Sequence, residues 1–113
     1  MMLDRPSDNS IVQQPFTGGG WAVDRGATTG SGVDAIAVWA FRLSDGQPVF
    51  VANATVGVPR PDIGAVFNGQ FTNSGFTFTI QGLTPGMYDL AVYVHSTVSS
   101  SFNQSRFARI TVR

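Results

Sequence analysis

The sequence has no cysteine, no lysine and no glutamate, and it has a single histidine. Without cysteine there is no disulfide, no thiolate nucleophile and no cysteine-ligated metal. The seven basic residues are all arginine and the seven acidic residues are all aspartate, so the formal net charge is zero. Nucleic acids and anionic lipids bind surfaces with clustered basic side chains, which this sequence does not offer. We therefore expect no nucleic-acid partner and no membrane insertion.

Long apolar runs are also missing. No segment approaches the roughly 20 apolar residues that span a bilayer, and Met1–Pro6 is not followed by the apolar run of a signal peptide. The 113 residues, of which 42% are hydrophobic, can bury one core but are too few for two ordinary domains. The prediction is a single domain covering residues 1–113.

The strongest local signal that is present is a turn followed by a strand. Pro85 and Gly86 mark a turn within Leu83–Tyr88, and apolar residues alternate with others from Tyr88 to His95. A tyrosine two residues past such a turn can donate its hydroxyl proton to the backbone just left, which fixes the corner where the chain crosses between two sheets. We therefore predict a structural role for Pro85, Gly86 and Tyr88.

Segments with strand composition, separated by turn residues, cover most of the chain. They are Met2–Pro6, Ile11–Phe16, Thr17–Asp24, Val33–Leu43, Pro48–Val56, Phe76–Ile80, Tyr88–His95 and Phe107–Arg113, with polar loops at Arg25–Gly32, Gly69–Gly75 and Ser96–Gln104. About seven short strands at such intervals predict an all-β, antiparallel two-sheet sandwich. Pro61 and Asp62 favour one short helical turn over Pro61–Phe67, because they suit its first positions.

The first sixteen residues have the composition of a sheet edge. Pro6 and Pro15 lack the backbone donor that a central strand position requires, so residues 1–16 are predicted to lie at an edge. In one version of this prediction the segment adds as a strand to the edge of the next subunit, and the chain is then a filament subunit.

Five short motifs in this order resemble bacterial immunoglobulin-like domains, which occur as accessory modules in large secreted or surface proteins. The motifs are Gly20–Asp24, Gly32–Trp39, Arg60–Ile63, Ser74–Phe76 and Leu83–Tyr88, and the resemblance runs from about Leu3 to Arg113. It implies an immunoglobulin-like fold and a non-catalytic spacer, adhesion or binding module. It also implies an extracellular or cell-surface location and no cofactor.

The chemistry-bearing residues are scattered. His95 is the one histidine, and no serine occupies the strained strand-to-helix turn of a typical nucleophile. We therefore expect His95 to be a surface or interface residue rather than part of a Ser-His-Asp set, and we expect no enzyme activity. The aspartates form no metal-binding motif, although Asp24 or Asp34 in a single loop Ca²⁺ site remains an alternative.

Arg60 and Asp62 flank a proline and allow two interpretations. Arg60 could anchor a carboxylate ligand through both ends of its guanidinium. Alternatively, Arg60 and Asp62 bind each other and hold the crossover turn against the sandwich. The spacing around a stiff proline favours this structural interpretation.

The alternation of inward and outward side chains along the strands predicts a candidate interaction site. If Ile36, Val38 and Ala40 point inward, three neighbouring strands share an outer face rich in aromatic rings. That face carries Trp39, Phe41, Tyr93, His95, Phe107 and Arg109. In the alternative register Trp39 is the buried core tryptophan, while Ile36 and Val38 are exposed.

Two functions follow from an exposed aromatic face. Contiguous apolar patches of several hundred Å² tend to be interfaces, so the first prediction is a structural or adhesion module that contacts copies of itself or neighbouring domains. The alternative is a carbohydrate-binding module, in which rings stack on sugars while Arg109, Asp89 or His95 bind hydroxyls. The sequence favours protein contact, because the face mixes alanine with aromatics and has few amide side chains.

Overall fold

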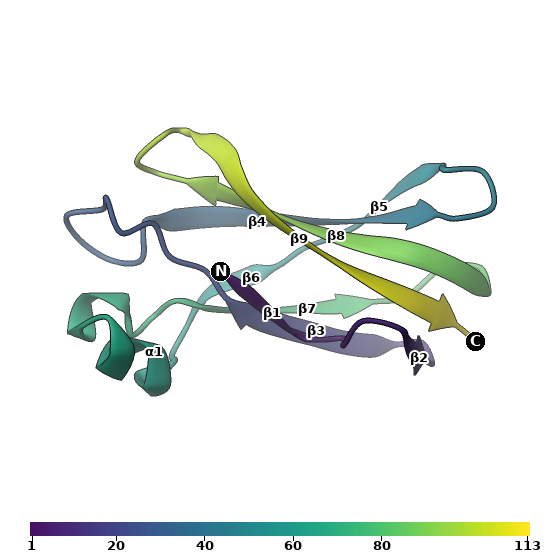
Figure 1. Ribbon diagram of the computed structural model, residues 1–113, viewed down its shortest axis with the longest axis horizontal. Coiled ribbons are helices and arrows are strands. Elements are labelled where there is room, and N and C mark those ends of the chain that lie inside the picture. Colours follow the sequence, from purple (N-terminus) through teal and green to yellow (C-terminus); the bar gives the residue numbers. More distant parts are fainter.

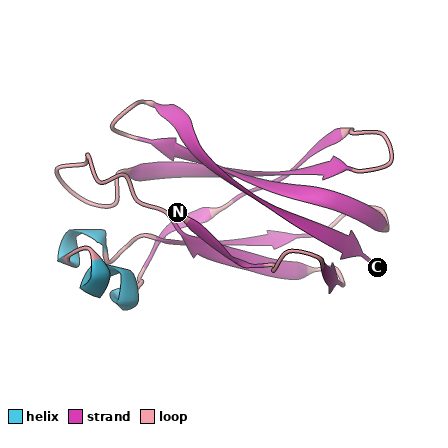
Figure 2. Cartoon of the chain, in the orientation of Figure 1, coloured by secondary structure: helices cyan, strands magenta, loops and turns pink.

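The computed structural model describes residues 1–113 as two β-sheets packed face to face, with a short helical segment at one end (Figures 1 and 2). The strands are β1 (Met2–Arg5), β2 (Ser10–Val12), β3 (Phe16–Trp21), β4 (Val33–Arg42), β5 (Pro48–Asn53), β6 (Thr55–Val58), β7 (Gly75–Ile80), β8 (Gly86–Ser96) and β9 (Ser101–Val112). The four-stranded sheet has the order β1-β3-β7-β6, and the five-stranded sheet has the order β2-β9-β8-β4-β5.

The expectation of about seven antiparallel strands is wrong in two respects, since there are nine strands and one pair is parallel. The segment predicted as one strand from Pro48 to Val56 is divided near Ala54, so β5 belongs to the five-stranded sheet and β6 to the four-stranded sheet. The N-terminal segment pairs β1 with β3 and then β2 with β9. β2 runs in the same direction as β9, and the five-stranded sheet is therefore mixed.

Within residues 1–16, β1 and β2 each form an edge strand of one sheet of their own chain, whereas Phe16 begins the inner strand β3. The backbone N–H of Asn9 donates to the carbonyl oxygen of Arg109 over 2.6 Å, and the Asp8 carboxylate accepts from the N–H of Arg109 over 2.7 Å. β1 and β2 thus lie at sheet edges within one chain. The exchange of this segment between subunits stays a prediction.

The helical segment consists of α1 (Pro61–Val66) and a 3₁₀ turn, η1 (Gly69–Phe71). α1 confirms the predicted helical turn, whereas η1 lies in a stretch predicted to be a loop. The side chain of Asn68 accepts a hydrogen bond from the N–H of Gln70 over 2.8 Å, which caps η1. Neither helix has the length and apolar character needed to cross a bilayer.

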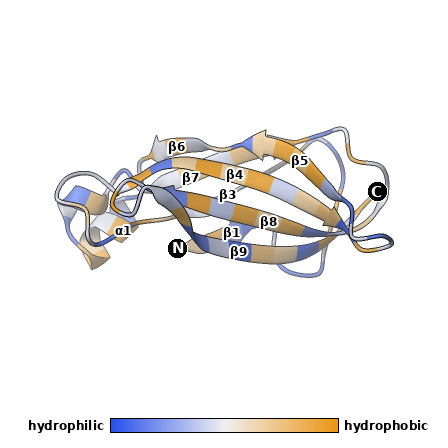
Figure 3. Cartoon of the chain, turned by 90° about the horizontal axis from the view of Figure 1, so that it is seen from above, coloured by the Kyte–Doolittle hydropathy of each residue, from blue (hydrophilic) through white to orange (hydrophobic).

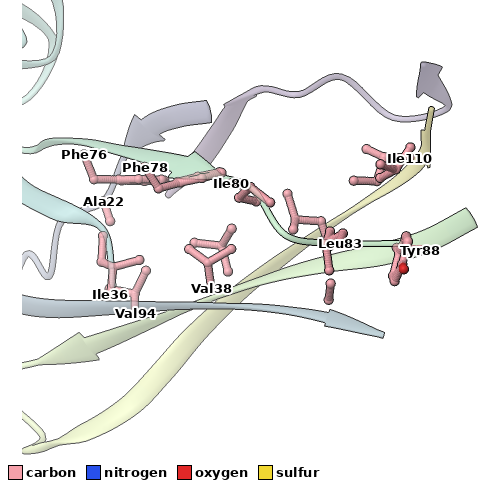
Figure 4. Packing of buried hydrophobic residues seen from close by; sticks show 14 residues of the cluster. Ala22, Ile36, Val38, Phe76, Phe78, Ile80, Leu83, Tyr88, Val94 and Ile110 are labelled. Carbon is pink, nitrogen blue, oxygen red and sulfur yellow. The ribbon is translucent and has the colours of Figure 1, made fainter. Parts of the chain in front are cut away.

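The core between the sheets is built from alternate residues of facing strands (Figure 4). Ile36, Val38 and Ala40 of β4 are buried in it. The first of the two predicted registers is therefore confirmed, and the register that buries Trp39 in the core is wrong. The two sheets and the segments next to them contribute Ala22, Ile36, Val38, Ala40, Phe76, Phe78, Ile80, Leu83, Tyr88, Leu90, Val92, Val94, Ile110 and Val112 to one cluster.

The turn at Pro85 and Gly86 has the predicted corner geometry. The hydroxyl of Tyr88 donates to the carbonyl oxygen of Thr84 over 2.7 Å and also lies 2.9 Å from the Thr84 hydroxyl. Tyr88 is buried, so this contact joins the start of β8 to the chain that arrives from β7. A buried tyrosine hydroxyl needs such a partner, because leaving it unpaired costs free energy.

Candidate functional site

The outer face of the five-stranded sheet carries all six side chains predicted for the site, two from each of three adjacent strands. They are Trp39 and Phe41 on β4, Tyr93 and His95 on β8, and Phe107 and Arg109 on β9. Figure 3 looks onto this sheet and shows hydrophobic colour recurring along β4, β5, β8 and β9.

The pairing register arranges these residues in rows across the sheet. Ala91 of β8 pairs with Trp39 on one side and with Phe107 on the other, and Asp89 lies in the same way between Phe41 and Arg109. Side chains opposite one another on one face of a sheet are close enough to touch. The six residues therefore form one continuous surface, which we call the outer face.

Two further aromatic rings extend the outer face. Phe50 of β5 pairs with Trp39, and their ring centroids are 5.3 Å apart at an interplanar angle of 73°. Phe102 of β9 lies against His95 with centroids 5.0 Å apart. Sequence reasoning missed Phe102 because it lies in a polar stretch predicted to be a loop. Phe50 could have been found by pairing Val33–Leu43 with Pro48–Val56 across Asp45-Gly46, a dipeptide typical of tight hairpin turns.

The rings of the outer face remain open to solvent. Phe107 is 57% exposed, Phe102 is 56% exposed and Phe50 is 48% exposed. Phe107 packs edge-on against Tyr93 with ring centroids 6.2 Å apart. Ala91 is fully buried although it lies on the same strand face, because larger side chains surround it.

A hollow lies in the outer face between the rings. It has a volume of about 220 Å³ and is lined by Ala37, Trp39, Tyr93 and Phe102. Its polar side-chain atoms are limited to the tyrosine hydroxyl and the indole N–H. The hollow therefore favours an apolar group that loses water on entering it.

One ion pair, Arg109–Asp89, and one histidine–carboxylate contact, His95–Asp34, lie on the outer face beside the rings. Nδ1 of His95 is 2.6 Å from Oδ1 of Asp34. Arg109 donates from Nε and Nη2 to the two carboxylate oxygens of Asp89 over 3.0 and 3.3 Å. The Asp89 carboxylate raises the pKa of Arg109 above its usual value. Because each charged group has a partner within the chain, these groups do not require an oppositely charged ligand.

The opposite surface, on the four-stranded sheet, is polar. Thr17 pairs with Thr79 and Gly19 pairs with Thr77, and the three threonines are exposed. The exposed side chains of these three residues therefore present hydroxyls and no aromatic ring. This polar surface provides a control surface for substitutions on the outer face.

The geometry of Arg60 matches the structural interpretation. Arg60 binds both oxygens of Asp62 over 3.0 and 2.9 Å, and its third donor reaches Asp4 over 2.9 Å. Hydrogen bonding to Arg60 lowers the pKa of Asp62. Arg60 thereby ties α1 to β1, and its guanidinium is occupied by two carboxylates of its own chain.

Three residues were candidates for catalysis (His95) or for a Ca²⁺ site (Asp24 and Asp34). Each of them is held by polar partners within the chain. Asp24 accepts hydrogen bonds from the hydroxyl of Ser96 over 2.5 Å, from the N–H of Gly26 over 3.0 Å and from Asn103 over 3.4 Å. These bonds, the one from Ser96 above all, lower the pKa of Asp24. Asp34 binds His95, and no group of three or more potential ligands is placed to hold a metal ion.

Comparison of the chain with protein-family models, with curated proteins and with solved structures found no match. The outer face and the strands that present it are therefore the structural basis for a proposed function.

Proposed function

We propose that this chain is an immunoglobulin-like, non-catalytic structural or adhesion module of a bacterial extracellular or surface assembly. It acts through protein-protein contacts on the outer face, with copies of itself or with neighbouring domains. Trp39, Phe41, Tyr93, His95, Phe107 and Arg109 are its contact residues, and it needs no cofactor.

The strand order supports the immunoglobulin-like part of the proposal. The order β1-β3-β7-β6 corresponds to the A-B-E-D sheet of immunoglobulin domains, and β9-β8-β4 corresponds to their G-F-C strands. The Tyr88 hydroxyl bond lies at the start of β8, which is the strand where such domains carry a tyrosine corner. The bacterial and extracellular parts rest on the resemblance of the five sequence motifs.

One observation carries the proposal of protein contact: the half-buried rings of Trp39 and Tyr93 and the exposed ring of Phe102 line a hollow with Ala37, and the exposed Phe50 and Phe107 lie beside it. Tryptophan, tyrosine and arginine are the side chains that most often dominate binding energy in protein interfaces. Burying such rings removes apolar area from water, which stabilises association by roughly 25 cal/mol per Å² before entropic costs.

A sugar fits the same surface less well. Binding pockets for small ligands usually measure about 300–1,000 Å³ and contain several placed polar groups, whereas this hollow measures about 220 Å³. A sugar hydroxyl in it would find few partners, and an unpaired buried polar group costs roughly 1–3 kcal/mol. One apolar side chain of a protein partner satisfies these conditions better.

The experiment is site-specific photo-crosslinking in the native source. A benzophenone amino acid replaces Phe107 on the outer face, and the matched control carries it at Thr79 on the opposite surface. We expect protein adducts from position 107 only. Adducts that form equally from both positions, or adducts to polysaccharide alone, would contradict the proposal.

A further inference from the structure

We propose that the occupant of the outer face is a second copy of this chain. The two copies pack face to face about a two-fold axis, and Phe107 of each enters the hollow of the other. This inference rests on the proposed function, because it identifies the partner of the same face. A two-fold interface uses one patch twice, so the patch must contain both a projection and its complement.

The outer face contains both parts. Phe107 is the most exposed ring on it at 57%, and it does not line the hollow. It lies beside Tyr93, which forms part of the wall of the hollow. The projection and the hollow are thus neighbours near the centre of the face, and a two-fold axis between them lets each copy insert one ring and receive one.

The charges permit this self-contact. The chain has a formal net charge of zero, so two copies meet without long-range repulsion. On the outer face of each copy the charges of Asp89 and Arg109 compensate each other, and Asp34 is held by a contact with His95. The neutral Asp89–Arg109 pair offers no net attraction to a partner of strong net charge, and a second copy of the chain needs none.

The area is sufficient for a dimer. Four strands about 4.8 Å apart and four rows of outward residues about 6.8 Å apart define a face of roughly 500 Å² per copy. Two such faces bury about 1,000 Å² in total, which is the lower limit for a specific interface. Because the exposed rings project from the sheet, the area buried in the dimer exceeds this value, which was calculated for a flat face.

The strand edges offer a weaker route to self-association. β5 begins with Pro48, and its pairing with β4 is interrupted by a bulge. The pairings of β1 and β6 are also irregular, and β2 has only three residues. Short, bulged and proline-bearing edges resist the addition of further strands. Association of two copies is therefore directed to the outer face.

Sedimentation equilibrium of the purified 113-residue chain over a concentration series tests the inference. Phe107→Ala removes the projection. Ala37→Arg fills the hollow with a guanidinium that stacks on the surrounding rings. Thr79→Arg is the matched control on the opposite surface, and thermal unfolding of each variant verifies its fold. We expect a wild-type dimer, an unchanged dimer for Thr79→Arg, and a dissociation constant at least about 30-fold higher for each of the other two variants.

Mixing the two weakened variants gives the sharper result. A heterodimer of Phe107→Ala with Ala37→Arg keeps one intact insertion, so the mixture must associate more tightly than either variant alone. A mixture no tighter than its components overturns the inference, and so does a wild-type monomer at every concentration. A monomer whose position 107 crosslinks to a different protein overturns only this inference, whereas a monomer with no such adduct overturns the proposed function as well.

Discussion

The contact between Gly18 and Phe78 allows a quantitative test of the core packing. The two residues are register partners on β3 and β7, and the phenyl ring occupies the space that a side chain at position 18 would need. A Cβ atom at Gly18 would lie 2.3 and 2.4 Å from two ring carbons, and 2.8 Å from the carbonyl oxygen of Arg5. Gly18→Ala therefore requires the ring to move within a packed core.

Each single change has a predictable cost. Overpacking by Gly18→Ala should destabilise the fold by about 1–3 kcal/mol, and truncation of the buried ring by Phe78→Ala should cost about 3–5 kcal/mol. Once the ring is absent, the two closest contacts of the added methyl group are removed, the 2.8 Å contact with the Arg5 carbonyl oxygen remains, and the methyl group partly fills the cavity. We expect the double variant to be more stable than the sum of the single changes indicates, by at least about 1 kcal/mol.

The assay is urea-induced unfolding of the four proteins in the cycle, followed by circular dichroism. Gly69→Ala is the matched control, because a Cβ atom at Gly69 has no neighbour within 4 Å. Its effect should add to that of Phe78→Ala within about 0.5 kcal/mol. If the effects of Gly18→Ala and Phe78→Ala on the free energy of unfolding also add within about 0.5 kcal/mol, the predicted packing of the ring over the glycine is refuted.

Three further predictions concern the corner, the pH dependence and the outer face. Tyr88→Phe should lower the free energy of unfolding by about 1 kcal/mol, because the hydroxyl loses its backbone acceptor; an unchanged urea midpoint would refute this. The pKa of Asp24 is lowered in the folded chain, mainly by Ser96, from a reference value of 3.8, so its stabilising contribution is present above that pH and is lost as the pH falls through the folded pKa. Asp24→Asn should therefore destabilise the chain more at pH 7 than at pH 2.5 in thermal unfolding, and an equal effect at both would argue against it. Trp39→Ala combined with Phe107→Ala should weaken association in light scattering while the circular dichroism spectrum stays unchanged; an unfolded double variant would show that these rings support the core.

Local patterns in the sequence were sufficient for much of the fold. Alternation on β4 and β8 predicted which residues are buried, and the Pro85-Gly86 turn predicted the tyrosine contact. These features depend on residues that are near one another in sequence, or on which face of a strand is apolar. The predicted members of the outer face follow from the same alternation.

The remaining features depend on pairing between distant segments. Nothing local shows that β2 lies parallel to β9, or that the chain changes sheets near Ala54. Phe102 belongs to a polar stretch that forms a strand because its backbone pairs with β8, and side-chain hydrophobicity does not report such pairing. The Asp34–His95 contact likewise joins residues 61 positions apart.

Hydroxyl-radical footprinting of the assembled protein tests most directly whether the outer face is a contact surface. Labelling of Phe107, Phe102 and Tyr93 is compared with that in the purified chain at a dilution where it is monomeric, and Val66 on α1, which is 73% exposed, serves as the internal control. We predict that the three rings are protected in the assembly while labelling of Val66 is unchanged. Rings labelled equally in both states, with protection elsewhere on the chain, would contradict the assignment of the outer face.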